Sequence, residues 1–138
     1  MYSMSDEEIV EILRAPTTIA LVGISDKPDR DSFQVAKYLM EQGYRVIPVN
    51  PMLETVLGQR CYPSLRDVPE RVDIVDIFRR SDAVPEIVDE AIEVGAKVVW
   101  MQLGVVHEDA AEKAEQAGLK AVMYRCIKRD HSRLVGRG

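Results

Sequence analysis

The residues best suited to do chemistry follow the first apolar run of the chain. Residues 18–22 (Thr-Ile-Ala-Leu-Val) end at Gly23, and a polar loop then leads to a helical pattern that begins at Ser32. A glycine lets a ligand approach the backbone closely, and the start of a helix offers unpaired N–H groups and a positive dipole end to a phosphate. The loop also carries the cations Lys27 and Arg30. This pattern predicts a phosphate-bearing ligand, with ordinary turn chemistry and solvated charges as the alternative.

The glycines of this loop differ from those of dinucleotide-binding proteins. That fingerprint needs three spaced glycines, and Ser25 and Pro28 stand where the second and third would fall. NAD-binding units also carry an acidic residue after the second strand, whereas this chain has Asn50 followed by Pro51, which would equally suit a simple turn. NAD is therefore disfavoured at both places, and an NAD(P)-binding sensor remains a weaker alternative.

Further candidates follow the later apolar runs. Arg79 and Arg80 come directly after Phe78. Two guanidinium groups at a strand end can pair with a phosphate through their forked donors, unless they are simply solvated. Gln102 and Gly104 follow the next apolar run and could receive an adenine or a pantetheine arm. These residues extend the predicted site across several strand ends.

Two other sets of reactive side chains point less clearly to chemistry. Asp73 and Asp76 are three apart in a strand and so point to opposite faces, which argues against a carboxylate pair for acid–base catalysis and favours structural roles. Cys126 follows the last apolar run and could exchange with a thiol ligand. An unreactive, half-buried cysteine is the simpler interpretation.

The elements that must position these residues alternate along the chain. A capping box of Ser5 and Glu8 predicts an N-terminal helix that ends near Ala15 and Pro16. Strand-length apolar runs and helical patterns follow in turn; the runs are 18–22, 44–49, 72–78, 97–101 and 119–124, and the helices are 32–42, 81–92 and 108–116. Such alternation gives a parallel sheet with right-handed crossovers.

We therefore predict an α/β fold, a Rossmann-like three-layer sandwich whose five-stranded parallel sheet has the order 3-2-1-4-5. The chain then reverses between strands one and four, and ligands bind in the crevice at the carboxyl ends of the strands beside such a reversal. Pro48 fits poorly inside the second strand, because proline removes a ladder donor. Residues 52–70 are expected to run irregularly over the surface, and the basic tail 125–138 to hold one short helical turn.

Composition bounds the class of protein. A chain of 138 residues, 46% hydrophobic and 30% charged, is expected to form a single soluble domain over 1–138. The net charge of −5 argues against nucleic acid as a partner. The apolar runs are too short to span a membrane and the acidic N-terminus does not resemble a signal peptide, so a cytoplasmic location is expected. Two cysteines and two histidines make neither a disulfide framework nor a zinc site.

Several segments together resemble a known family. They are 22–25, with Pro28, Arg30 and Ser32, and then 43–51, 61–65, 72–80, 100–104 and 125–126. This set is similar to the small stand-alone CoA-binding-domain proteins of bacteria and archaea. It also resembles the N-terminal CoA-binding domain of succinyl-CoA synthetase alpha subunits and of nucleotide-diphosphate-forming acyl-CoA ligases. The resemblance covers about residues 9–134.

The resemblance implies a Rossmann-like domain that binds coenzyme A or an acyl-CoA across the crevice. It places the pyrophosphate at the loop from Gly23 to Ser32, which includes Ile24, Ser25, Lys27, Pro28 and Arg30. The nucleotide would be flanked by Asn50-Pro51 and Phe78-Arg79, and the opposite lip would consist of Met101, Gln102 and Gly104.

The resemblance does not extend to ligase chemistry. The ligases carry a phosphorylated histidine in a second domain, and neither His107 nor His131 matches it. We therefore expect a CoA-binding protein without catalytic residues of its own. The alternative is a subunit of an acyl-CoA-handling enzyme that acts with a protein partner, which the sequence does not identify.

Overall fold

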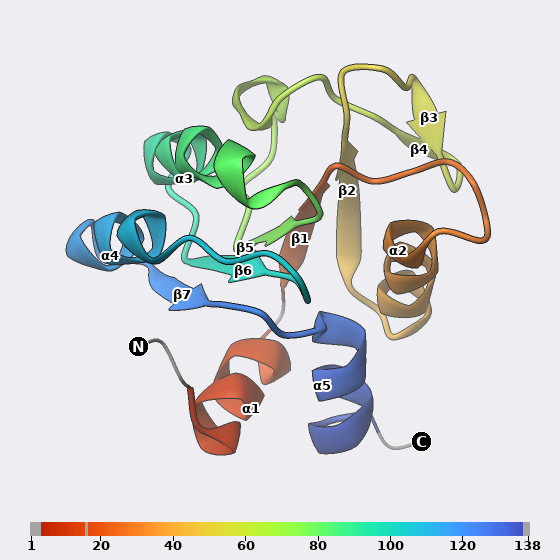
Figure 1. Cartoon of the computed structure of the whole chain (residues 1–138). Helices are drawn as coiled ribbons and strands as arrows, with labels where there is room; N and C mark the ends of the chain where they lie inside the picture. The colour runs from red at the N-terminus through yellow and green to blue at the C-terminus, as the bar shows by residue number, and fades with distance from the viewer. Residues whose placement is uncertain (1–3, 16, 137–138) are drawn as a thin grey trace.

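The computed structural model describes residues 4–15 and 17–136, and its elements alternate as the sequence pattern predicts. Five strands form one parallel sheet: β1 (Thr18–Val22), β2 (Arg45–Val49), β5 (Ile74–Ile77), β6 (Val98–Met101) and β7 (Lys120–Val122). The α-helices are α1 (Asp6–Arg14), α2 (Asp31–Glu41), α3 (Val84–Glu93), α4 (Glu108–Gln116) and α5 (Ile127–Leu134). Figure 1 shows this arrangement. The predicted Rossmann-like α/β class is confirmed.

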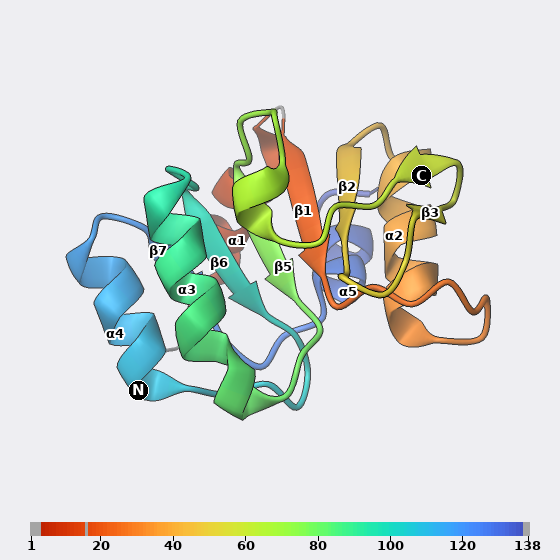
Figure 2. The ribbon, with the colours of Figure 1, turned by 90° about the horizontal axis from the view of Figure 1, so that it is seen from above.

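The order of the strands differs from the prediction at one place. The sheet runs β2-β1-β5-β6-β7, which is 2-1-3-4-5 when its strands are counted along the chain, as Figure 2 shows from above. The strand that follows the irregular segment therefore pairs with β1, with Ile19 opposite Ile74, and does not lie outside β2. The predicted order 3-2-1-4-5 was wrong in this respect, and the chain reverses between β1 and β5.

Pro48 fits the observed order. β2 is an edge strand that pairs only with β1 in the sheet, and the Pro48 carbonyl accepts from the Tyr62 amide at 3.0 Å on its outer side. The Pro48 nitrogen faces the same way, so the missing N–H removes no bond to β1. Tyr62 lies beside the end of β2 in a short parallel bridge with Val49.

Two further segments are more regular than predicted. Residues 52–70 contain a small antiparallel hairpin, β3 (Thr55–Val56) with β4 (Gln59–Arg60), and the 3-10 turn η1 (Leu65–Asp67). The tail forms the whole helix α5 in place of a single turn. The capping box of Ser5 and Glu8 begins α1, which ends at Arg14. The helix was expected to end near Ala15 and Pro16, and Pro16 lies outside the described residues.

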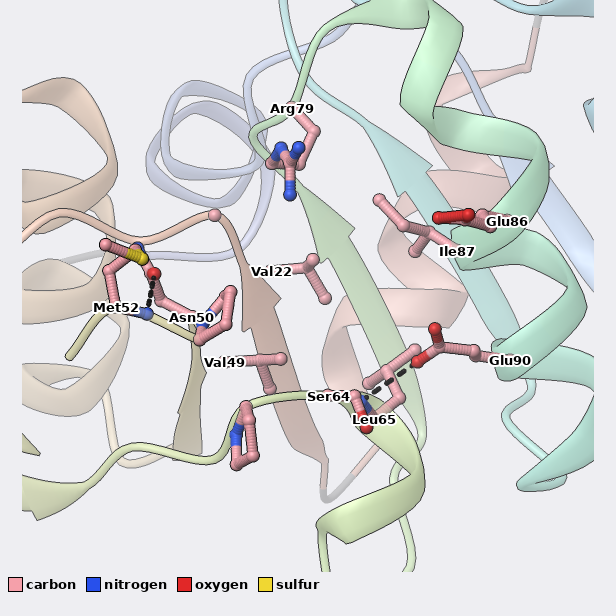
Figure 3. Close-up of a pocket in the computed structure, with 13 residues that line it drawn as sticks. Val22, Val49, Asn50, Met52, Ser64, Leu65, Arg79, Glu86, Ile87 and Glu90 are labelled. Carbon is pink, nitrogen blue, oxygen red and sulfur yellow. Dashed lines mark hydrogen bonds between the residues drawn. The ribbon is translucent and has the colours of Figure 1, made fainter. Parts of the chain in front are cut away.

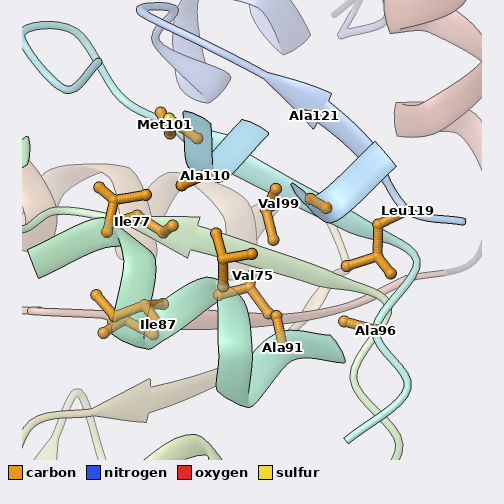
Figure 4. Close-up of a cluster of buried hydrophobic side chains, with 14 of the residues drawn as sticks. Val75, Ile77, Ile87, Ala91, Ala96, Val99, Met101, Ala110, Leu119 and Ala121 are labelled. Atoms are coloured by element: carbon orange, nitrogen blue, oxygen red, sulfur yellow. The ribbon is translucent and has the colours of Figure 1, made fainter. Parts of the chain in front are cut away.

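Helices cover both faces of the sheet. One face packs against α3 and α4, where Val75, Ile77, Val99 and Met101 meet Ile87, Ala91 and Ala110, as drawn in Figure 4. The other face packs against α1, α2 and α5, through residues such as Ile19, Leu21 and Trp100. Fully buried strands explain the continuous apolar runs. Among the described residues, no helix combines the length and apolar character that a membrane crossing requires.

Candidate functional site

The reversal between β1 and β5 brings two loops into direct contact. Gly23 ends β1 with a φ of +90°, and its N–H donates to the Val49 carbonyl at 2.9 Å. A Cβ at this position would lie 2.4 Å from the Phe78 carbonyl oxygen and 2.8 Å from Cδ of Arg79. Only glycine fits both this backbone conformation and this close approach. The predicted glycine loop therefore meets the Phe78-Arg79 segment at the carboxyl end of the sheet.

The loop after Gly23 is folded by its own serines. Ser32 is the second residue of α2, and its Oγ accepts from the Ser25 amide at 2.9 Å. The Ser25 Oγ in turn accepts from the Lys27 amide at 3.0 Å. No side chain caps α2, because its N-cap residue is Arg30. The N-terminus of α2 thus keeps amides that can donate to an anion.

A hollow of about 340 Å³, here called the loop hollow, lies against this helix start. It is lined by Gly23, Ser25, Asp29, Arg30, Asp31, Ser32 and Phe78. Arg30 and the α2 dipole favour an anion there, whereas Asp29 and Asp31 oppose it. The amides and the dipole are fixed by the fold, while the three charged side chains are exposed and surrounded by water.

A cavity of about 500 Å³ lies on the α3 side of the reversal and is called the main hollow (Figure 3). Its apolar wall comes from Val22, Val49, Leu65 and Ile87. Its polar rim is formed by the side chains of Asn50, Ser64, Arg79, Glu86 and Glu90. An apolar wall with a few polar groups at its rim suits a planar organic ring.

The side chain of Asn50 is engaged in holding this cavity together. Its Nδ2 donates to the Ile24 carbonyl at 2.8 Å, and its Oδ1 accepts from the Met52 amide at 2.8 Å. The first contact ties the end of β2 to the loop after β1. Glu90 has a similar function on the other side, because its Oε1 accepts from the Leu65 amide at 3.1 Å. Both contacts fix the walls of the main hollow.

A third cavity of about 310 Å³, the α5 hollow, opens between α2 and α5. It is lined by Asp31, Gln34, Val35, Phe78, Gln102, Leu103, Cys126, Lys128 and Arg129. The start of α5 is held in place by Oε1 of the buried Gln102, which accepts from the Ile127 amide at 3.1 Å. The Trp100 indole also donates to the Arg125 carbonyl at 2.8 Å. Because Gly23 lines the main and loop hollows, and Phe78 the loop and α5 hollows, the three cavities adjoin along one crevice.

The structure gathers most of the predicted residues around this crevice. Those that line one of its hollows are Gly23, Ser25, Arg30, Ser32, Asn50, Pro51, Phe78, Arg79 and Gln102. Arg79 reaches the main hollow, and no carboxylate among the described residues lies within 4 Å of its guanidinium. Each of these side chains or backbone groups is thus placed at the carboxyl ends of β1, β2, β5 or β6.

Other predicted residues lie elsewhere. The side chains of Ile24 and Met101 are fully buried in the core, on opposite faces of the sheet. Arg80 pairs with Asp82 at 3.0 Å, and its side chain is 85% exposed. Lys27, Pro28 and Gly104 are exposed on loops and line none of the three hollows.

Sequence reasoning missed one wall of the site. Glu86, Ile87 and Glu90 come from α3, and their spacing places them on one side of that helix. The available signal was a pair of carboxylates four residues apart beside an apolar stripe. Among the described residues, no group of three or more potential ligands is arranged to hold a metal ion.

Comparison with known proteins identifies relatives of this arrangement. Residues 17–132 match the family described as CoA binding domain. The protein YneT of Bacillus subtilis is 41% identical over 132 residues, which are 96% of this chain and 98% of that protein. The ADP-forming acetate–CoA ligase II of Archaeoglobus fulgidus is 32% identical over 102 residues, but the match covers 72% of this chain and only 15% of the ligase. A solved structure of a hypothetical protein from Pyrococcus horikoshii OT3 has a TM-score of 0.94 and 49% identity, covering 97% and 94% of the two chains.

Proposed function

Because this chain belongs to the family of CoA-binding domains, we propose that it binds coenzyme A or an acyl-CoA in the crevice at the β1–β5 reversal. The observation that carries this proposal is the contact between the Gly23 loop and the Phe78-Arg79 segment, which joins three adjoining hollows. Coenzyme A is a long ligand with a nucleotide, a diphosphate and an uncharged arm, and such a chain of hollows suits its length.

The chemistry of each hollow suggests which part of the ligand it takes. The diphosphate suits the loop hollow, where the amides of α2 and Arg30 are donors. The adenosine part suits the main hollow, which has an apolar wall and Arg79 at its rim for a phosphate. The remaining arm then extends towards Gln102 and the α5 hollow.

We propose binding without ligase chemistry for the chain alone. The relatives that are named as ligases are much longer, and the chain spans 15% and 19% of the two Archaeoglobus fulgidus enzymes. Action together with a protein partner is the second candidate, because exposed Leu103, Val106 and Tyr124 follow the neighbouring strands β6 and β7. Thioester turnover that needs an added partner chain would favour the second candidate.

Thermal unfolding with coenzyme A and with NAD at equal concentration tests the ligand. A ligand at a hundredfold excess over its Kd stabilises the folded state by about 2.7 kcal/mol. We expect coenzyme A to raise Tm clearly and NAD to raise it much less, because the three-glycine loop and the acidic residue are missing. Equal stabilisation by NAD would contradict the proposal.

Calorimetry of two neighbouring arginine variants tests the site. Arg79→Ala removes a guanidinium that lines the main hollow, and we expect a loss of affinity of roughly tenfold to a hundredfold, as for one charge-assisted contact. Arg80→Ala is the matched control, because Arg80 is paired with Asp82 in solvent. Equal affinities of the two variants would exclude Arg79 from the binding site.

A further inference from the structure

Asp76 is a buried acid without a partner. It lies on β5, the central strand of the sheet, and its side chain is fully inaccessible to solvent. Both of its carboxyl oxygens lack a hydrogen-bond partner, which is true of no other buried side-chain nitrogen or oxygen in the described part of the chain. The other buried acid, Asp130, is held by Arg125 at 2.7 and 3.2 Å. Leaving a carboxyl in this condition is costly, so a fold that keeps one calls for an explanation.

The surroundings of Asp76 are apolar. On the neighbouring strands it lies opposite Leu21 of β1 and Trp100 of β6, and both belong to the core cluster on the α2 and α5 side. Trp100 on the neighbouring strand and Gln102, two residues further along the chain, form their hydrogen bonds elsewhere. The Trp100 indole donates to the Arg125 carbonyl, and Oε1 of Gln102 accepts from the Ile127 amide. Asp76 therefore retains its full capacity for hydrogen bonding.

Phe78 connects this buried group with the crevice. Residues two apart in a strand share a face, so Phe78 is the next side chain on the face of Asp76, roughly 7 Å nearer to the carboxyl end. Phe78 is half-buried, packs against the same apolar cluster, and lines both the loop hollow and the α5 hollow. Asp76 itself lines none of the three hollows, and along this face of the sheet Phe78 is the residue that separates it from the crevice.

Burial also decides the form of the acid. It raises the pKa of Asp76 well above the ordinary value of 3.8. The protonated carboxyl has one O–H donor and one carbonyl acceptor side by side. This pair of groups matches the N–H and C=O of an amide. A phosphate would have to leave water for an apolar site without a cation, which is far more costly.

We propose that Asp76 recognises the amide-bearing pantetheine arm of coenzyme A, which reaches the carboxyl when the Phe78 side chain turns out of the α5 hollow. This inference rests on the proposed function, because it assigns one part of that ligand. The arm is narrow and uncharged, so it can pass beside the Phe78 ring. It alternates apolar segments with amides, and one of these amides can pair with the neutral acid. The energy needed to move Phe78 lowers the apparent affinity and makes it selective for a ligand that can pair with the acid.

The test separates the two parts of the ligand. Binding of 4′-phosphopantetheine and of adenosine 3′,5′-bisphosphate is measured by calorimetry on the wild type, Asp76→Leu and Asp76→Asn. Leucine removes both hydrogen-bonding groups, so we expect phosphopantetheine to bind roughly tenfold more weakly and the bisphosphate to bind as before. Asparagine retains a donor and an acceptor and should restore most of the affinity. Ile74→Val, on the same face, is the control for altered packing alone.

A second measurement uses the wild type without substitution. The infrared band of the protonated Asp76 carboxyl, assigned by its loss in Asp76→Asn, should shift when phosphopantetheine binds and stay unchanged with the bisphosphate. An unshifted band, or equal losses for both probes in Asp76→Leu, would overturn the inference and leave coenzyme A binding intact. A carboxyl permanently satisfied by a buried water would give that unshifted band. Failure of the wild type to bind intact coenzyme A in the same calorimeter would overturn the proposed function and this inference together.

Discussion

Replacing Asp76 by asparagine should make the protein more stable, and increasingly so as the pH rises. The two side chains have nearly the same shape, so packing against Leu21 and Trp100 is preserved. Burial raises the pKa of the acid in the folded protein, whereas the unfolded chain releases its proton near pH 3.8. The folded state therefore binds more protons than the unfolded state at every pH between these two pKa values, and a rise in pH favours unfolding.

The size of the effect follows from this linkage. Each pH unit above the unfolded-state pKa costs the wild type about 1.4 kcal/mol, until the pH passes the folded-state pKa. Asparagine does not titrate, so the stability difference between variant and wild type should grow with that slope and then reach a plateau. Taking the difference cancels groups present in both proteins, such as His131, whose pKa burial lowers, and Tyr44, whose pKa burial raises to about 12.

Urea unfolding at a series of pH values from 4 to 9 measures this difference. Glu112→Gln, on the exposed side of α4, is the control and should change stability by no more than about 0.5 kcal/mol. A difference for Asp76→Asn that stays constant across the whole series would refute the reasoning. It would mean that the carboxyl titrates alike in the folded and unfolded chains, and hence that it is not isolated from water and from cations.

Three further outcomes are expected. Gly23→Ala should destabilise the fold by roughly 1–3 kcal/mol in urea unfolding, because of its φ of +90° and the approach of Phe78; a neutral effect would contradict that contact. Met101→Ala should cost about 2–5 kcal/mol in the same assay, as for a fully buried core side chain, and a smaller loss would place Met101 outside the core. With the disulfide of coenzyme A, peptide mass analysis should find an adduct at Cys126, which lines the α5 hollow, before the buried Cys61; modification of Cys61 alone would remove Cys126 from the site.

The class of fold was predictable because strands and helices alternate in the sequence, but the neighbours of each strand were not. β1, β2 and β5 are all apolar runs buried on both faces. Such runs look alike in the sequence, so they do not indicate which strands are neighbours in the sheet. The sequence does contain one signal for the order of the strands. Pro48 is far better tolerated at an edge, and the predicted order had placed its strand inside the sheet.

Site residues whose position depends on a strand end were predictable from the sequence. Site residues that reach the crevice only through tertiary packing were not. Gly23 and Arg79 follow directly from strand ends, whereas Glu90 reaches the crevice only because α3 packs beside the reversal. Helix α5 escaped prediction because two of its buried positions are polar. Asp130 and His131 face inward there, paired with Arg125 and Tyr38, so the expected apolar stripe is broken.

The two edge strands of the sheet limit how copies of this chain can associate at high concentration. Along β2, Pro48 offers no outward N–H, and Tyr62 already occupies the backbone groups near the end of the strand. Along the other border, β7 is three residues long and begins with the exposed Lys120. Open strand edges are the usual templates for aggregation, and short, charged or proline-bearing edges suppress it. Copies of this chain are therefore poorly suited to stack by extending the sheet, so self-assembly would have to proceed through helices or loops.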